Sequence, residues 1–286
     1  MKNNYYKILF KRLFSSFSFL IPLIILSLLF IIGLFVFLNV DSSMFDINLS
    51  ESFTSPSKKH IFGTNEYGQD FFTIVFIAIY NTLILAFIVS FVNIIIGCII
   101  GIIWGNSPKI DSLMIVIKNV FDNIPSIFFY IIIIYSLGTN TLSLLVIIIL
   151  FNWINTACLI RNNLLSLRNQ DYNKVSKLMG TPFYKIALFN YLPSLLPIVF
   201  NSFAVSFPQI ISVEITLSYF NLNLTNQEMS LGNILYSSIS NNYCFSHPYL
   251  FIIPLVFLLI ITLCFFFIGK AISTLSNKEV LSNDKN

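Results

Sequence analysis

Few residues in this sequence have the chemistry that a catalytic or metal site needs. The chain has 286 residues but only two histidines, His60 and His247, and four cysteines. Cys244 lies just before His247, and such a pair can begin a metal site, but the acidic residues are scattered along the chain. We therefore predict no metal site, no catalytic residues and no bound cofactor.

Nucleotide-binding motifs are missing as well. Gly269-Lys270 lacks the earlier glycine and the following hydroxyl residue of a phosphate-binding loop of the type G-x-x-x-x-G-K-S/T. The motifs HExxH, GxSxG and CxxC are also absent. The sequence predicts a protein that is not an enzyme, so any ATP that it uses must be hydrolysed by a separate subunit.

Two acidic residues lie where the surrounding sequence predicts hydrocarbon. Asp122 stands in an apolar run three residues before Pro125, which is placed to kink the helix. An ionisable group at that depth is costly and usually faces a bundle interior or water, so Asp122 is a candidate for a translocation pathway. Alternatively, its carboxylate pairs with Lys118 one turn earlier. Glu214 is a further candidate, although a solvated helix end near the outer surface is the simpler expectation.

A polar, punctuated stretch begins at Asp171, in contrast to the apolar runs on either side. Asp171 is placed to cap a short helix, and Gly180 to end it in the left-handed conformation. A threonine-proline pair directly after the glycine is placed to start a second helix. We expect this second helix to stop near Leu192, before Pro193 and Pro197.

The first of these short helices has one apolar face on an otherwise hydrophilic segment, which suits a groove in a partner protein. The docking candidates are Asp171, Tyr172, Lys174, Val175, Ser176, Leu178, Met179 and Gly180. An interfacial helix on the lipid headgroups is the alternative, which the lysines of this stretch would favour.

The same stretch resembles a known family. Lys174-Val175-Ser176, followed by Gly180 and later by Leu192-Pro193, resembles the cytoplasmic EAA loop of permease subunits of ABC importers. In that family the loop carries a coupling helix that sits in a cleft of the ATP-hydrolysing subunit. The Glu-Ala-Ala triplet is Lys-Val-Ser here, so its first charge is reversed, whereas the glycine, the Leu-Pro pair and their spacing are kept.

A second motif lies between the first two apolar runs. Gly63 and Gly68, among polar and acidic residues, predict a tight turn that leads into the next run. The segment also resembles the HxxGTDxxGRD signature of the C-type permease of oligopeptide and dipeptide importers, with Asn65 and Gln69 in place of the usual Asp and Arg. The positions that match are His60, Gly63, Thr64, Gly68 and Asp70.

A third resemblance to the same permeases begins at Glu214. Residues 214–223 resemble ExxLSFLGLG, with Asn221 and Asn223 where glycines are usual. Ser230-Leu231-Gly232 resembles the Ser-Trp-Gly that follows in the family. Asparagine tolerates left-handed geometry better than other non-glycine residues, so these exchanges are compatible with the same turn.

The composition is that of a polytopic membrane protein, with 56% hydrophobic residues, 10% charged residues and a mean hydropathy of +0.84. Because roughly 20 apolar helical residues cross a bilayer, the sequence predicts six spans. They lie near residues 17–39, 76–103, 113–137, 141–160, 195–217 and 249–269. The first run is too long for the apolar core of a cleaved signal peptide, so we expect it to remain as a span.

The distribution of positive charge predicts the orientation. Of the 16 Lys and Arg residues, all except Lys58 and Lys59 fall on one side of the predicted spans. Cytoplasmic flanks carry such an excess, so both termini are predicted to be cytoplasmic. The net charge of +4 reflects this asymmetry and does not indicate nucleic-acid binding.

The resemblance implies an all-α integral membrane protein with six transmembrane helices and the ABC-importer permease fold. We expect residues 1–72 to hold the cytoplasmic N-terminus, the first span and an outer loop. Residues 73–275 would form a five-span transmembrane domain with the coupling loop near residues 161–193, and residues 276–286 a cytoplasmic tail.

The implied function is that of a permease subunit of an ATP-driven importer, which moves oligopeptides or dipeptides across the cytoplasmic membrane of a bacterium. Its implied partners are a second homologous permease, two ATP-binding cassette ATPase subunits, an extracytoplasmic substrate-binding protein and the lipid bilayer, with no nucleic acid. The alternatives are a related importer for nickel or another small solute, and a secondary transporter without an ATPase.

Overall fold

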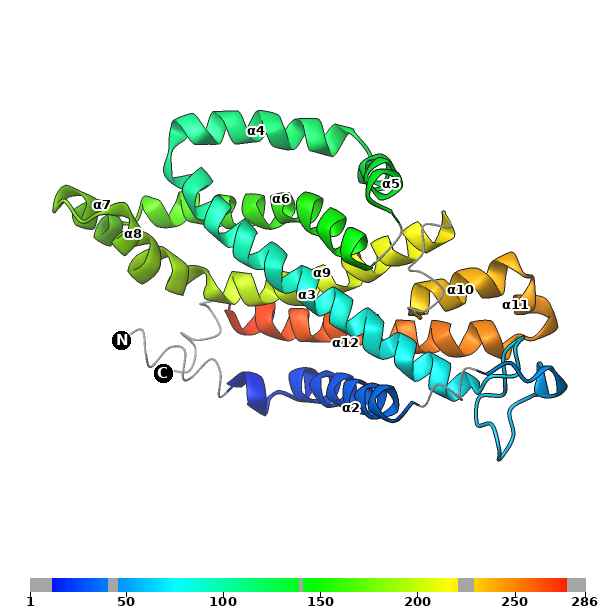
Figure 1. The fold of residues 1–286 in the computed structure, drawn as a ribbon. Coiled ribbons are helices and arrows are strands. Elements are labelled where there is room, and N and C mark those ends of the chain that lie inside the picture. Colours follow the sequence, from blue (N-terminus) through cyan, green and yellow to red (C-terminus); the bar gives the residue numbers. More distant parts are fainter. Residues whose placement is uncertain (1–11, 41–45, 139–140, 221–228, 277–286) are drawn as a thin grey trace.

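The structure, a computed structural model, describes residues 12–40, 46–138, 141–220 and 229–276, and these are mostly helical. Five of their helices are long and apolar enough to cross a membrane: α2 (Phe17–Asn39), α3 (Phe71–Asn106), α6 (Thr141–Arg168), α9 (Leu192–Tyr219) and α12 (Tyr249–Ser276). A bent pair, α4 (Pro108–Asn123) and α5 (Ser126–Leu137), is a sixth candidate (Figure 1). The predicted class of a six-span helical membrane protein is confirmed.

The short elements lie at the two ends of this bundle (Figure 1). At the end where α2 begins and α12 finishes are α7 (Asp171–Leu178), α8 (Phe183–Ile186) and the π-helical turn η3 (Ala187–Tyr191). At the opposite end are η2 (Leu49–Glu51), α10 (Leu231–Ser240) and α11 (Tyr243–Ser246). The segments predicted to face the cytoplasm and those predicted to face outward are thus separated, as the charge pattern requires.

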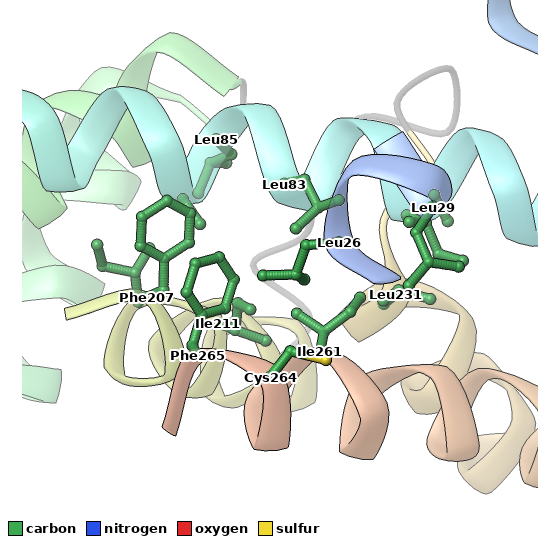
Figure 2. Packing of buried hydrophobic residues seen from close by; sticks show 14 of the residues in the cluster. Leu26, Leu29, Leu83, Leu85, Phe207, Ile211, Leu231, Ile261, Cys264 and Phe265 are labelled. Carbon is green, nitrogen blue, oxygen red and sulfur yellow. The ribbon is translucent and has the colours of Figure 1, made fainter. Parts of the chain in front are cut away.

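The main core lies where α2, α3, α9 and α12 meet (Figure 2). Leu26 of α2 and Leu83 of α3 are buried there beside two aromatic residues. The rings of Phe207 and Phe265 stack with their centroids 4.0 Å apart, which joins α9 to α12. Because lipid is as apolar as these side chains, such packing must come from close contact rather than from exclusion of water.

Helices α3 and α6 approach each other along a row of glycines spaced four residues apart, Gly97, Gly101 and Gly105. A Cβ atom on Gly101 would lie 2.6 Å from the carbonyl oxygen of Ala157, and one on Gly97 would lie 2.7 Å from Cβ of Thr156. The absence of side chains on this face of α3 therefore lets the two backbones pack closely.

The third span was predicted to be kinked at Pro125, but it is broken there into two helices, because α4 and α5 meet at an angle of 83°. The break lies at Ile124, whose backbone is extended (φ −108°, ψ 121°), and Pro125 is the N-cap residue of α5. A proline disfavours the helical conformation of the residue before it and cannot donate a backbone hydrogen bond. Pro125 therefore ends one helix and begins another instead of only kinking the span.

Pro193 and Pro197 were predicted to end a helix, and this too is wrong, since a continuous helix runs from Phe183 to Tyr219. The π-helical turn η3 lies directly before Pro193. A wider turn of this kind is a common way of accommodating a proline ring and its missing N–H within a helix. Helix α6 also extends beyond its predicted end at residue 160, reaching Arg168.

Candidate functional site

The most exposed apolar side chains of the polar stretch belong to α7. Leu178 and Met179 are 86% and 78% exposed, and Tyr172 and Val175 are about half exposed. These are the four residues whose spacing predicted an apolar face, and within the described ranges Val175, Leu178 and Met179 keep half or more of their surface exposed. The helix begins at Asp171 with Gln170 as the N-cap residue, which corrects the prediction that Asp171 is the cap.

The other face of α7 is held by an asparagine that the sequence pattern did not single out. The side chain of Asn173 is fully buried, and its Nδ2 donates to the carbonyl oxygen of Leu167 at 2.7 Å. Its Oδ1 accepts a hydrogen bond of 2.9 Å from Asn190, which follows α8. These bonds fix α7 to both flanking helices, so that the segment projects from the bundle as a rigid unit.

Gly180 ends α7 in the left-handed conformation, as predicted, with a φ of +73°. Its N–H donates to the carbonyl oxygen of Lys177 at 3.0 Å, and the N–H of Thr181 donates to that of Ser176 at 3.1 Å. This pair of bonds is the Schellman motif. The second helix starts slightly later than predicted, because Pro182 is its N-cap residue and α8 begins at Phe183.

A polar cluster ties the helices together close to α7. Arg161 of α6 donates to both carboxylate oxygens of Asp111 on α4, at 2.7 and 2.6 Å, and Nε1 of Trp104 on α3 donates to the same carboxylate at 2.7 Å. Arg168 donates to the carbonyl oxygen of Gly105 at 2.8 Å. The two arginines lie 50 and 63 residues from their partners, so no local pattern could have indicated their bonds.

The two predicted pathway acids occupy different places. Asp122 lies at the end of α4 and pairs with Lys118, as the alternative interpretation expected, and its side chain is 48% exposed. Pro125 and Asp122 line a recess of about 220 Å³ at the bend, and Glu214 does not belong to that lining. A role for Asp122 in transport stays a prediction.

Glu214 is buried, which overturns the expectation of a solvated helix end. Its exposed fraction is 2%, and neither carboxylate oxygen has a hydrogen-bond partner among the described residues. The hydroxyls of Thr82 and Ser230 are its polar neighbours. Next to it, the N–H of Leu231 donates to Oγ1 of Thr82 at 3.1 Å, which fastens the start of α10 to α3.

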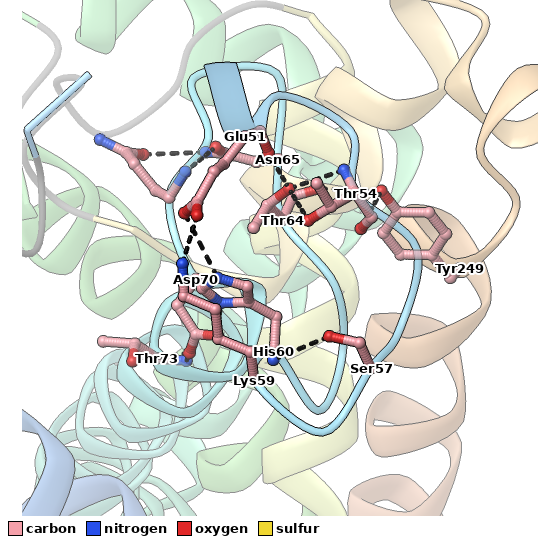
Figure 3. Close-up of polar contacts among 11 residues, drawn as sticks. Glu51, Thr54, Ser57, Lys59, His60, Thr64, Asn65, Asp70, Thr73 and Tyr249 are labelled. Carbon is pink, nitrogen blue, oxygen red and sulfur yellow. Dashed lines mark hydrogen bonds and ion pairs between the residues drawn. The ribbon is translucent and has the colours of Figure 1, made fainter. Parts of the chain in front are cut away.

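The glycine motif between the first two spans forms a hydrogen-bonded corner (Figure 3). Gly63 and Gly68 both have left-handed backbones, with φ of +78° and +75°. Thr64 is fully buried, and its hydroxyl donates to the carbonyl oxygen of Glu51 at 2.6 Å and accepts from the N–H of Thr54 at 2.8 Å. The predicted tight turn before the second span is confirmed.

The corner is joined to α3 by Asp70, its N-cap residue. Oδ2 of Asp70 accepts from the N–H of Thr73 at 3.0 Å, and Oδ1 lies 2.9 Å from Nδ1 of His60 (Figure 3). Asn65, which stands where the family has Asp, donates to Oε1 of Gln69 at 2.8 Å. The two departures from the signature therefore bond to each other.

Loops from distant parts of the chain meet at this end of the molecule. The phenol of Tyr243 donates to the carboxylate of Glu66, and this bond raises the pKa of Tyr243 to about 12. Lys59 contacts Glu51 and lowers the pKa of that carboxyl. The ring of His247 stacks on Phe53 with a centroid distance of 4.1 Å. Within the described ranges no group of three or more metal-binding side chains gathers.

Most of the chain matches a known family. Residues 94–276 match the family described as binding-protein-dependent transport system inner membrane component. The chain belongs to this family. A multi-pass membrane location, predicted from composition, agrees with that description.

Similar proteins extend the match over nearly the whole chain. It is 32% identical over 281 residues to the oligopeptide transport system permease protein AmiD of Streptococcus pneumoniae (strain ATCC BAA-255 / R6). The aligned region covers 96% of this chain and 90% of that protein. This chain is 28% identical over 215 residues to the dipeptide transport system permease protein DppC of Lactococcus lactis subsp. cremoris (strain MG1363), with 75% of this chain and 62% of that protein covered.

A solved structure supports the fold. An inward-facing conformation of the MetNI methionine ABC transporter superposes with a TM-score of 0.57 over 71% of this chain and 96% of that chain, at 18% identity. The ABC-importer permease fold, which the sequence resemblance implied, is confirmed.

Proposed function

We propose that this chain is the permease subunit of an ATP-driven importer that moves oligopeptides or dipeptides across the bacterial cytoplasmic membrane. Its similarity to peptide permeases over almost its full length supports the substrate class. The observation that carries the mechanism is the exposed apolar face of α7, on a helix whose other face is fixed by Asn173.

In this proposal α7 docks in a cleft of an ATPase subunit. The exposed side chains of Val175, Leu178 and Met179 enter the cleft and lose their contact with water. An interfacial helix on lipid headgroups would also bury this face, but the Schellman turn at Gly180 and the buried Asn173 hold α7 as a projecting knob. A helix held in one orientation suits a groove in a protein better than the fluid surface of a bilayer.

Movement of the docked α7 reaches the spans through the polar cluster. Arg168 links the end of α6 to the end of α3, and Arg161 links α6 to Asp111 of α4. Bidentate charge-assisted bonds of this kind are among the strongest polar contacts in proteins. Displacing α7 therefore displaces α3, α4 and α6 together.

The complete importer, in this proposal, contains a second homologous permease, two ATPase subunits and an extracytoplasmic substrate-binding protein that delivers peptide to the outer loops. ATP is hydrolysed by the ATPase subunits alone. Residues 73–275 form the transmembrane domain, and residues 161–193 its coupling loop.

Val175→Asp tests the docking face. The side chain is half exposed on α7, so the variant permease should fold and insert normally. An unpaired charge buried in an apolar cleft costs several kcal/mol, so we expect the ATPase to be lost from the complex during purification in mild detergent. Ser112→Asp, which adds the same charge at an exposed position of α4, is the control and should keep the ATPase. If both variants retain it and import peptide normally, the ATPase docks elsewhere.

Gly180→Val tests the turn independently of the face. Apart from its chain neighbours, no described residue lies within 4 Å of the added Cβ, so the cost comes from the left-handed backbone and should be roughly 1 kcal/mol or more. We expect α7 to be misdirected and ATP hydrolysis to become uncoupled from uptake in reconstituted vesicles, with insertion unchanged. Coupling equal to that of the wild type would show that the turn is not needed.

A further inference from the structure

Two of the long apolar helices each carry a stripe of mostly polar side chains that are exposed or half-buried. On α6 the stripe follows steps of three and four residues through Asn152, Asn155, Leu159, Asn162 and Ser166. On α9 it follows Asn201, Val205, Gln209, Ser212 and Thr216. Some of the hydroxyls bond within their own helix, as Thr216 does to Ser212, but side-chain amides such as those of Asn155 and Gln209 are costly to place in hydrocarbon. These two stripes therefore face water or protein rather than lipid.

The stripes converge on a cavity of about 270 Å³ between α3, α6 and α9. Six of the residues that line it are Asn93, Asn152, Asn155, Asn201, Ser202 and Gln209. No Asp, Glu, Lys or Arg is part of the lining. The cavity therefore presents amide and hydroxyl groups without a fixed charge, and it does not favour either sign of charge on its occupant.

Within the described ranges, Asn93 presents an unpaired side-chain amide to this cavity. Asn93 is 2% exposed and lines the cavity, yet neither its Nδ2 nor its Oδ1 has a hydrogen-bond partner among the described residues. Nδ2 of Asn152 is also buried and has no partner in the described part of the chain. A buried donor or acceptor without a partner costs about 1–3 kcal/mol. A ligand with both hydrogen-bond donors and hydrogen-bond acceptors would satisfy these groups.

A peptide main chain has this chemistry, because each residue offers one N–H donor and one carbonyl acceptor whatever its side chain. We propose that the amide-lined cavity is a main-chain binding site on the peptide pathway, in which Asn93, Asn152 and Gln209 bond to successive peptide groups. The inference rests on the proposed function. It explains how one path can pass peptides of different charge, since the lining has no charge of its own.

The size of the cavity limits what it holds. Sites for small molecules usually measure about 300–1,000 Å³, so about 270 Å³ accommodates a short stretch of peptide rather than a whole oligopeptide. Transport also requires a site that releases its ligand, and a few neutral hydrogen bonds give such weak binding. Water can meet the same groups between passages, because it too donates and accepts.

The test uses the whole importer in vesicles, with its ATPases, second permease, binding protein and ATP. Its probes are radiolabelled penta-alanine and the same peptide methylated on its central main-chain nitrogen. Gln209→Leu, at an exposed position, and Asn93→Leu, at the buried one, should each lower penta-alanine uptake by about fivefold or more. Asn163→Leu is the matched control on α6, because its amide donates to the carbonyl oxygen of Leu159 and does not line the cavity. It should stay within about twofold of the wild type.

The methylated peptide separates main-chain binding from a general defect. The ratio of wild-type to variant uptake should fall toward one for this probe, because the methyl group removes the donor that the amides bind. Taking this ratio cancels the preference of the binding protein for either peptide.

Three results would overturn the proposal. Equal penta-alanine uptake by the wild type and both lining variants would refute the cavity site and leave the proposed peptide import standing. Loss of the second permease from the purified variant complexes would show that the stripes form a subunit interface instead. No uptake of either peptide by the wild type would remove the proposed peptide import itself, and the cavity site with it.

Discussion

At the scale of single residues, two carboxylates of this permease lie in opposite environments. Asp111 accepts three hydrogen bonds from Trp104 and Arg161, and its charge is matched. Glu214 is buried with no hydrogen-bond partner among the described residues. A matched carboxylate stabilises a fold, whereas a buried and unmatched one is a cost that other contacts must offset.

Replacing each acid by its amide should therefore have opposite effects on stability. Asp111→Asn removes the charge that Arg161 needs, and we expect it to lower the free energy of unfolding by about 1–3 kcal/mol. Glu214→Gln keeps the shape and removes the unmatched carboxylate, so its melting temperature should equal or exceed that of the wild type. Thermal unfolding of the purified complex in detergent measures both. A lower melting temperature for Glu214→Gln would mean that the carboxylate has a stabilising partner in the assembled complex.

At the scale of elements, local sequence signals predicted more than long-range contacts did. The runs of apolar residues predicted the five long helices, and the glycines at 63, 68 and 180 predicted left-handed turns, because residues close together in the sequence decide each of these features. The effect of a proline on its helix was underestimated at one position and overestimated at another. Pro125 separates two helices, whereas Pro193 lies within one, and the difference depends on the flanking backbone rather than on the proline.

The candidate sites were predictable only in part, for the same reason. The apolar face of α7 follows from helical spacing, and it was found. The bond between Arg161 and Asp111 and the cavity around Asn93 each join residues from different helices. The residue pattern of one helix does not indicate which other helix it will pack against. The burial of Glu214 depends in the same way on α10 folding back over α3.

The close packing of α3 on α6 gives a prediction at this scale. Gly101→Ala would place Cβ 2.6 Å from a carbonyl oxygen of α6, so the helices must separate, at a cost of about 1–3 kcal/mol. Gly269→Ala on α12 is the matched control, because its nearest neighbours would lie at an ordinary 3.5 Å. We expect a clear fall in melting temperature for the first variant and little change for the second. Equal stabilities would show that α3 and α6 are free to move apart.

At the scale of the whole molecule, the two ends of the bundle carry different chemistry. The polar cluster and α7 lie at one end, and the hydrogen-bonded corner with α10 and α11 lies at the other (Figure 1). The charge pattern predicts that the first of these ends faces the cytoplasm.

Cysteine labelling measures this orientation. In a protein with Cys244 replaced by serine, Ser57→Cys should react with an impermeant maleimide in intact cells. Lys109→Cys should react only after the membrane is opened. Both positions are exposed, so accessibility reports the side of the membrane rather than burial. Labelling of both from outside would contradict the six-span topology.

The lengths of two helices have a mechanical consequence. Helix α3 has 36 residues, and the continuous helix from Phe183 to Tyr219 has 37. At 1.5 Å per residue each is about 55 Å long, and even a tilt of about 40° leaves it longer than the roughly 30 Å of hydrocarbon. Both have one end beside α7: Lys177 donates to Asn106 at the end of α3, and Gly180 leads from α7 into the other helix. Helix α3 has no proline in its interior, so when a bilayer holds it near its middle it can act as a lever. A displacement of a few ångströms at the α7 end therefore swings the far end by a similar amount in the opposite direction.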